Sequence, residues 1–297
     1  MSEPTPRPLR SVLYMPGSNA RALEKAKAIP ADGLILDLED AVAPDAKAQA
    51  REQVCEAAKS GEYGKRVVTI RVNGLDTEWH DADVAAAAAA RPGAIVVPKV
   101  NSAQDVLRVE SALMTANADE STAIWAMIET PAAILQIEEI ASATPRLTTF
   151  VMGTNDLLSE LRAQHTPERT SLVHALAQCV LAARAHGKTI LDGVYNDVKD
   201  DAGFAAECRQ GRVLGFDGKT LIHPSQVEPC NAAFAPSEKD IEHARGDRRV
   251  RAVAARGQGC RDRERQADRE PARRRRAARP RVQRGDRLSL AFSEAIG

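Results

Sequence analysis

The chain has 297 residues, of which 43% are hydrophobic and 28% are charged, and its formal net charge is zero. This length suits one large domain or two small ones, because α/β barrels routinely reach about 250 residues as a single unit. No run of about 18 apolar residues occurs, which excludes a transmembrane helix. The polar, proline-rich start lacks a signal-peptide pattern, and five scattered cysteines without a Cys-x-x-Cys pair exclude a disulfide framework and a structural zinc site. We therefore expect a cytoplasmic globular protein without a membrane partner.

The zero net charge conceals two segments of opposite charge. Residues 246–297 contain 16 arginines, no lysine and 7 acidic residues, a net charge of +9, so that residues 1–245 carry −9. An arginine-rich segment is typical of a basic tail or a nucleic-acid-binding arm. This one lacks the lysines and, apart from Phe292, the aromatic residues of such arms, and its composition is that of GC-rich codons read in a shifted frame. We hypothesise a frameshift near residues 245–246, and expect a folded catalytic domain over 1–245 followed by a disordered or frameshifted segment over 246–297.

Short aliphatic and β-branched runs alternate with alanine-rich amphipathic stretches. Eight runs are predicted as strands: 11–15, 33–38, 67–72, 94–97, 123–128, 148–152, 189–194 and 215–221. The stretches after them are predicted as helices: 20–28, 45–60, 81–90, 103–116, 132–142, 171–186, 202–212 and 237–245. Eight strands, each followed by a helix, predict a (β/α)8 TIM barrel, here with a C-terminal extension. A doubly wound sheet is the alternative, weakened because no Gly-x-Gly-x-x-Gly follows the first strand.

Polar and charged residues follow every predicted strand, at the barrel face where active sites gather. Six of them are carboxylates: Asp37, Glu39, Asp40, Glu129, Asp156 and Asp192. Several converging carboxylates with few histidines and no nearby cysteine predict a site for a hard cation, Mg²⁺ or Mn²⁺, rather than zinc. Magnesium takes only one or two protein carboxylates, which leaves room for a chelating 2-oxo acid whose carbonyl group it would polarise.

Two basic residues stand at the same face. Arg71 is the natural partner for the carboxylate of the 2-oxo acid, because a guanidinium group pairs with a carboxylate in bidentate fashion. Lys99 is suited to an imine or to an electrostatic role, and we favour the electrostatic role because nothing in its sequence surroundings activates the amine. Structural roles stay open for three acids: Asp37 and Asp40 as loop or helix-capping residues, and Asp156 as the cap of the helix that follows it.

Seven segments, in this order, resemble a known family: residues 10–17 (RSVLYMPG), 36–42 (LDLEDAV), 70–74 (IRVNG), 97–99 (VPK), 128–131 (IETP), 153–157 (GTNDL) and 221–224 (LIHP). They are similar to the citrate lyase beta subunit-like CoA-ester lyases, within the wider citrate lyase/2-oxo-acid aldolase superfamily that includes malyl-CoA and citramalyl-CoA lyases. The resemblance covers about residues 9–245. It implies a (β/α)8 barrel, assembled as a homotrimer or hexamer, that uses Mg²⁺ to cleave or form 3-hydroxy-3-carboxyacyl-CoA esters.

The resemblance also implies roles for individual residues. Glu129 and Asp156 would be the metal ligands and, with Arg71, the catalytic residues. Arg71 and Glu129 would contact the substrate, and the backbone of Gly153 and Thr154 would lie against its 2-oxo-acid end. The products of the carbon–carbon lyase reaction would be an acyl-CoA and a 2-oxo acid, formed through an acyl-CoA enolate.

Four further residues would surround this centre. Asp37, Glu39 and Asp40 would order metal-bound waters, and Lys99 would act on them electrostatically. Some relatives hydrolyse the thioester, so a malyl-CoA thioesterase is one alternative function. A CoA-independent 2-oxo-acid aldolase is another. A nucleic-acid-associated protein acting through the arginine-rich tail ranks last, because residues 1–245 offer no basic face, and no nucleic-acid partner is expected.

The C-terminal segment departs from the pattern of the family. In malyl- and citramalyl-CoA lyases, a segment that packs over a neighbouring subunit supplies an acid that moves a proton at the acyl-CoA carbon. The corresponding stretch here is the arginine-rich 246–287, where Asp262, Glu264 and Asp268 have no motif to support them. We therefore expect a protein that binds Mg²⁺ and a 2-oxo acid but has weakened lyase activity.

Overall fold

The computed structural model describes residues 8–238 and residue 242. Eight parallel strands close into a barrel in sequence order, because β1 pairs with both β2 and β8. The strands are β1 Ser11–Pro16, β2 Gly33–Asp37, β3 Val67–Arg71, β4 Ala94–Val97, β5 Ala123–Ile128, β6 Leu147–Met152, β7 Thr189–Asp192 and β8 Gly218–Leu221. This closed sheet of βα units confirms the predicted (β/α)8 barrel.

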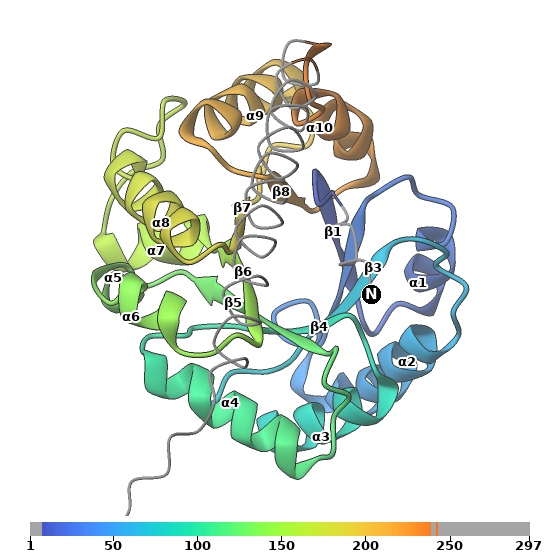
Figure 1. Ribbon diagram of the computed structural model, residues 1–297. Helices are drawn as coiled ribbons and strands as arrows, with labels where there is room; N and C mark the ends of the chain where they lie inside the picture. The colour runs from blue at the N-terminus through green and yellow to red at the C-terminus, as the bar shows by residue number, and fades with distance from the viewer. Residues whose placement is uncertain (1–7, 239–241, 243–297) are drawn as a thin grey trace, which may run out of the picture. The chain divides into compact units, whose positions relative to one another are not determined.

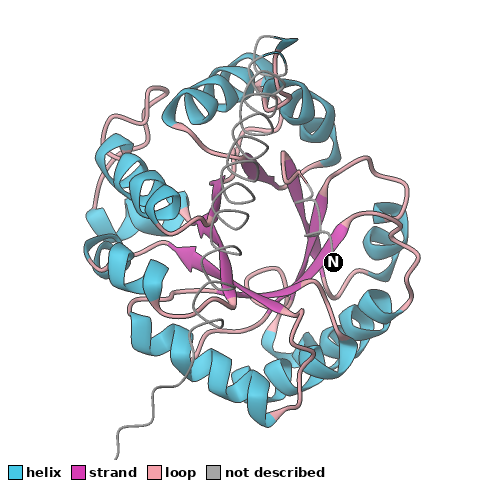
Figure 2. Cartoon of the chain, in the orientation of Figure 1, coloured by secondary structure: helices cyan, strands magenta, loops and turns pink. Residues whose placement is uncertain are grey.

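The helices form a layer around the closed ring of strands (Figures 1 and 2). They are α1 Ala20–Ala26, α2 Lys47–Lys59, α3 His80–Ala90, α4 Ala103–Thr115, α5 Pro131–Leu135, α6 Ile137–Ser142, α7 Thr154–Leu161, α8 Val173–Ala185, α9 Asp201–Leu214 and α10 Val227–Ala233, with 3-10 turns at Pro44–Ala46 and Pro224–Gln226. None of the described helices has the length and apolar character needed to cross a membrane. The predicted C-terminal extension, the boundary at 245 and the arginine-rich 246–297 lie outside the described residues, as do residues 239–241 and 243–245 of the helix predicted over 237–245.

Element boundaries differ from the predicted ones at a few places. The single helix predicted over 132–142 is two helices, because the backbone at Gln136 leaves the helical region. Helix α10 was not predicted, although its proline, Pro229, stands in the first turn, where a helix tolerates the missing N–H group. The last two strands are shorter than predicted: β7 ends at Asp192 and β8 begins only at Gly218.

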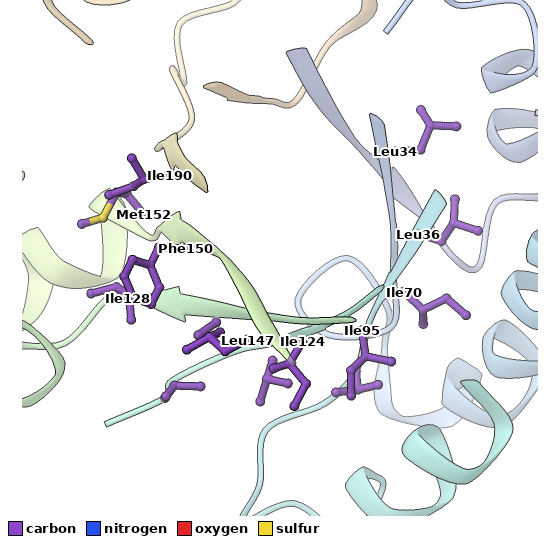
Figure 3. Close-up of a cluster of buried hydrophobic side chains, with 14 of the residues drawn as sticks. Leu34, Leu36, Ile70, Ile95, Ile124, Ile128, Leu147, Phe150, Met152 and Ile190 are labelled. Atoms are coloured by element: carbon purple, nitrogen blue, oxygen red, sulfur yellow. The ribbon is translucent and has the colours of Figure 1, made fainter. Parts of the chain in front are cut away.

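Alternate side chains of each strand face opposite sides of the barrel wall. One set fills the barrel interior: Val12, Ile35, Ala94, Val96, Trp125, Met127, Val151 and Leu191. The other set packs between the strands and the helices, and Figure 3 shows part of it, including Leu34, Leu36, Ile70 and Ile95. Because both faces are covered, the strands read as nearly continuous apolar runs. This packing fixes the direction in which the residue at each strand end points.

The prediction that Asp192 joins the other carboxylates at the barrel mouth is wrong, because its side chain lies on the opposite face of the strand. Leu191 lies in the barrel interior, so Asp192 faces the helices and is fully buried there. Its carboxylate is 2.7 Å from Nη1 of Arg169 and 3.3 Å from Nζ of Lys219, and Lys219 is also 2.6 Å from Glu207. Burial alone raises the pKa of Asp192, but Lys219 and Arg169 outweigh it and hold that pKa below its usual value. Asp192 thus belongs to a buried ion cluster.

We expect the Asp192→Asn variant to lower the free energy of unfolding by about 3–5 kcal/mol, because it leaves two buried cations with one carboxylate. Urea denaturation measures this change. Glu138→Gln is the matched control, since Glu138 pairs with His186 at the surface and its side chain is 76% exposed. The control is expected to change stability by less than about 1 kcal/mol. Equal effects of the two substitutions would contradict the assignment.

Candidate active site

A cavity of about 400 Å³ lies at the carboxyl ends of the strands. It brings together most of the residues predicted for the site: Asp37, Asp40, Arg71, Glu129, Gly153, Thr154 and Asp156. The two remaining predicted residues, Glu39 and Lys99, line a second cavity of about 460 Å³, which shares Asp40 with the first. The sequence-predicted set is therefore divided between two adjoining cavities.

The wall of the first cavity also contains residues that the sequence analysis did not single out. They are mainly apolar: Tyr14, Met127, Met152, Val194 and Ile222. Strand alternation is a signal that would have identified two of them. Tyr14 lies two residues after Val12, and Met127 two residues before Glu129, so each points to the interior with its neighbour.

Arg71, the last residue of β3, is a buried cation surrounded by carboxylates. Its Nε and Nη2 atoms donate to Asp37 at 2.6 and 2.7 Å, and its Nη1 atom lies 2.7 Å from Glu39 and 3.5 Å from Asp40. The ring of Tyr14 lies 5.0 Å from the guanidinium carbon, within reach of a cation–π contact. Burial opposes the charge, but the hydrogen bonds and charge of Asp37 raise the pKa of Arg71 well above its usual value. Arg71 therefore keeps its positive charge inside the cavity.

Asp37 holds both Arg71 and the loop that follows β2. Besides the bidentate pair, its two oxygens accept hydrogen bonds from the backbone N–H groups of Glu39 at 2.9 Å and Ala41 at 3.1 Å. No helix begins at these residues, since the next regular turn starts at Pro44, so Asp37 holds a loop and does not cap a helix. The side chain of Asp40 is 71% exposed and stands at the rim of both cavities.

Glu129, one residue beyond β5, is a buried carboxylate with one oxygen unused. Its Oε1 atom accepts a hydrogen bond from the backbone N–H of Lys99 at 2.6 Å, while its Oε2 atom has no hydrogen-bond partner among the described residues. A β-carbon at Gly153 would lie 2.3 Å from Oε2, so only glycine leaves space for this carboxylate. Burial, together with the nearby charges of Glu39 and Asp156, raises the pKa of Glu129 to about 8, although the hydrogen bond from Lys99 acts in the opposite direction.

Lys99 reaches Glu129 through its backbone. Its φ angle of 52° lies in the left-handed region, which is uncommon for a residue other than glycine. This conformation places the N–H group on the Glu129 carboxylate, whereas the exposed side chain lines the second cavity and not the first. Backbone strain of this kind concentrates at functional sites. The contact of Lys99 with the site is thus a backbone hydrogen bond, and nothing in this arrangement favours an imine.

Asp156 lies in the first turn of α7. The helix begins at Thr154, directly after β6, with Gly153 as its N-cap residue and no side-chain cap. Asp156 is therefore inside the helix and is not its cap. A carboxylate in the first turn is favoured by the helix dipole. Its position near Glu129 brings two carboxylates to one side of the cavity.

The arrangement has the chemistry of a site for a hard cation. The buried Oε2 atom of Glu129 has no hydrogen-bond partner among the residues described, and a second carboxylate, Asp156, lies nearby. Burying such an oxygen without a partner is costly, and a bound cation would remove that cost. No group of three or more His, Cys, Asp or Glu side chains suited to enclosing a metal ion occurs in the described part of the chain. Two carboxylates are too few for a structural zinc site, but they are enough for magnesium, which keeps waters and accepts ligand oxygens.

Comparison with known proteins agrees with this geometry. Residues 10–224 match the HpcH/HpaI aldolase/citrate lyase family. The chain is 52% identical over 237 residues to a (3S)-malyl-CoA thioesterase of Cereibacter sphaeroides, covering 80% of this chain and 81% of the relative. It is 38% identical over 283 residues to an L-malyl-CoA/beta-methylmalyl-CoA lyase of the same species, covering 86% and 89%.

A solved structure adds a likeness in three dimensions. The citrate lyase beta subunit of Mycobacterium tuberculosis, complexed with oxaloacetate and magnesium, aligns with a TM-score of 0.66 and 28% sequence identity. The alignment covers 77% of this chain and 98% of that structure. Fold, cavity position and sequence similarity lead to one conclusion: the chain belongs to the HpcH/HpaI aldolase/citrate lyase family.

Proposed function

We propose that this protein is a magnesium-dependent enzyme that acts on 3-hydroxy-3-carboxyacyl-CoA thioesters of the malyl-CoA type, and that thioester hydrolysis is its principal reaction. The observation that carries the proposal is the buried Glu129 carboxylate, which lines the same cavity as Asp156 and Arg71 and whose Oε2 atom has no hydrogen-bond partner among the described residues. The 52% identity with a malyl-CoA thioesterase supports the choice of substrate class and of hydrolysis. Mn²⁺ is expected to replace Mg²⁺, because both prefer oxygen ligands.

Each residue of the cavity has a defined task in this proposal. Glu129 and Asp156 hold the magnesium ion, which supplies Lewis-acid polarisation of the substrate oxygen when bound. Arg71 binds the carboxylate of the acyl group, and Asp37 orients the guanidinium through its bidentate pair. The N-terminus of α7, which no side chain caps, directs the backbone N–H of Thr154 toward the same negative end of the substrate. The N–H of Gly153 donates to the backbone oxygen of Ile128 at 3.0 Å, so Gly153 contributes space and not a donor.

Carbon–carbon cleavage is the second candidate reaction. It is favoured by the malyl-CoA lyase relative, whose similarity extends over 86% of this chain. The same cavity is suited to both reactions, because each develops negative charge on a carbonyl oxygen next to the metal. The proton-transferring acid that the family resemblance implies would come from the C-terminal segment, which lies outside the described residues. Assembly as a homotrimer or hexamer and cytoplasmic location stay predictions.

The products formed from malyl-CoA distinguish the two reactions. With Mg²⁺ present, we expect free CoA and malate, detected as a new thiol and by chromatography. Cleavage of the carbon–carbon bond would instead give acetyl-CoA and glyoxylate, detected as a hydrazone without a new thiol. The second outcome would assign the lyase reaction, and absence of both products would contradict the proposed function. Citramalyl-CoA and citryl-CoA, tested in parallel, establish the size of the acyl group.

Glu129→Gln is expected to abolish Mg²⁺-dependent binding of oxalate, which imitates a 2-oxo acid, and Asp156→Asn is expected to weaken it by at least about tenfold, because each removes a charged ligand. Isothermal titration calorimetry with Mg²⁺ and oxalate measures both effects. Asp201→Asn is the matched control, since Asp201 also lies in the first turn of a helix but is exposed and lines neither cavity. Unchanged binding in Glu129→Gln would remove Glu129 from the metal site.

Magnesium binding is also expected to depend on pH. Burial raises the pKa of Glu129 to about 8 in the metal-free protein, so this carboxyl is protonated below pH 8 and must lose its proton to bind the cation. Affinity for Mg²⁺ is therefore expected to rise by about tenfold per pH unit up to this pKa and to level off above it. Calorimetry in two buffers of different ionisation enthalpy should detect close to one released proton at pH 6.5. A pH-independent affinity with no proton release would contradict the assigned pKa.

A further inference from the structure

We propose that Lys47, the first residue of α2, is a positioning residue for the active site. Its buried ammonium group fixes the loop that carries Glu39 and Asp40, and so sets the contact between Glu39 and Arg71. The effect on ligand binding rests on the proposed function, whereas the structural link does not. The sequence analysis did not identify Lys47, which lies outside the first cavity.

The ammonium group of Lys47 uses all of its hydrogen-bond donors. Nζ donates to the backbone oxygens of Leu38 at 2.7 Å and Glu39 at 2.8 Å, and to Oδ1 of Asn73 at 2.7 Å. The residue is only 6% exposed. An ammonium group has three donors, so each one meets an acceptor, and two of the three acceptors are consecutive peptide groups of the same loop.

The ammonium group of Lys47 is not neutralised by any carboxylate that the structure describes, whereas a buried lysine usually is. None of the ion pairs found among the described residues involves Lys47, and its acceptors are two carbonyls and one amide. The face of the Trp79 ring lies 5.2 Å from Nζ on another side. Burial lowers the pKa of Lys47, against the charges of Asp37 and Glu39. Retaining a buried cation without an ion-paired carboxylate is costly, which favours a geometric role for this residue.

The third acceptor is anchored independently. Both the backbone N–H and the side-chain amide of Asn73 donate to Oδ2 of Asp83, at 3.0 and 2.6 Å, and Oδ1 of Asp83 accepts from Arg51 at 2.6 Å. The backbone oxygen of Asn73 is 2.8 Å from Nδ1 of His80. Asp83 and His80 belong to α3, so Lys47 connects the loop after β2 to a fixed point on a neighbouring helix.

These bonds fix the backbone of Glu39, whose side chain contacts Arg71. The carbonyl of Glu39 is held by Lys47, and the N–H of Glu39 is held by Asp37 at 2.9 Å. With its backbone fixed on both sides, Glu39 reaches Nη1 of Arg71 at 2.7 Å. Loss of the Lys47 bonds frees the carbonyl of Leu38, leaves the carbonyl of Glu39 with only the N–H of Val42 at 3.0 Å, and allows the loop to shift. The carboxylates around Arg71 then no longer present its guanidinium in one orientation.

The test separates positioning from general stability by measuring two affinities. Lys47→Met keeps an unbranched side chain that is one atom shorter and removes all three donors. We expect affinity for oxalate in saturating Mg²⁺ to fall by about 10- to 100-fold, the usual effect of removing a group that orients a ligand-binding residue. Affinity for Mg²⁺ alone is expected to stay within about threefold, because Glu129 follows β5, Asp156 lies on α7, and neither residue contacts Lys47. Calorimetry measures both without requiring turnover.

Two further variants complete the experiment. Lys59→Met is the matched control, because Lys59 lies at the exposed end of the same helix, and it should change neither affinity. Lys47→Arg keeps a buried cation and several donors, but a planar fork cannot serve three acceptors around one atom, so an intermediate loss of about three- to tenfold is expected. It also replaces Lys47→Met if circular dichroism indicates that the methionine variant does not fold.

Two results would overturn the inference. Oxalate affinity equal to that of the wild type in folded Lys47→Met or Lys47→Arg protein would leave Lys47 with a structural role only. Equal losses of Mg²⁺ and oxalate affinity would mean that the whole site is disturbed. A wild-type protein that binds neither Mg²⁺ nor oxalate would instead overturn the proposed function together with this inference, so the two failures are distinguishable.

Discussion

Strand alternation in a closed parallel barrel is the constraint on which the rest of this structure depends. Because successive side chains face opposite sides of the wall, the last residues of each strand point either into the barrel mouth or toward the helices. Asp37, Arg71 and Glu129 point inward and meet in one cavity, whereas Asp192 and Lys219 point outward and are buried beneath helices. The same rule therefore places one set of charged residues, from β2, β3 and the end of β5, in the cavity, and another set, from β7 and β8, in a buried ion cluster.

The two groups of buried charges differ in how completely they are neutralised. In the outer cluster, Asp192 and Glu207 oppose Arg169 and Lys219, and the pKa of Asp192 lies below its usual value. In the cavity, Glu129 has only one backbone hydrogen bond, and burial raises its pKa to about 8. A protein of marginal stability tolerates such an uncompensated group where a ligand completes it. The incomplete group is accordingly the one to which we assign a function.

The cavity side chains are held largely by backbone groups. The N–H of Lys99, in a left-handed conformation, fixes Glu129, and the absence of a side chain at Gly153 leaves space for the same carboxylate. Lys47 in turn binds the backbone oxygen of Glu39. Positions of this kind carry little signal in sequence, because the contacting atoms are present in every residue. They explain how loops at the strand ends present charged groups in one orientation.

The sequence alone determined the barrel and most of the residues that meet at its mouth. Eight apolar runs that alternate with helices are compatible with few other folds. Seven short motifs identified Arg71, Glu129 and Asp156 as candidate site residues before the structure was known. Only the tertiary structure decided that Asp192 turns away, that Glu39 and Lys99 border a second cavity, and that Lys47 connects two loops. The physical reason is the separation along the chain over which each kind of interaction acts. Periodicity and turn chemistry act over a few residues, whereas burial, ion pairing and hydrogen-bond partners depend on groups distant in sequence that the closed barrel brings together.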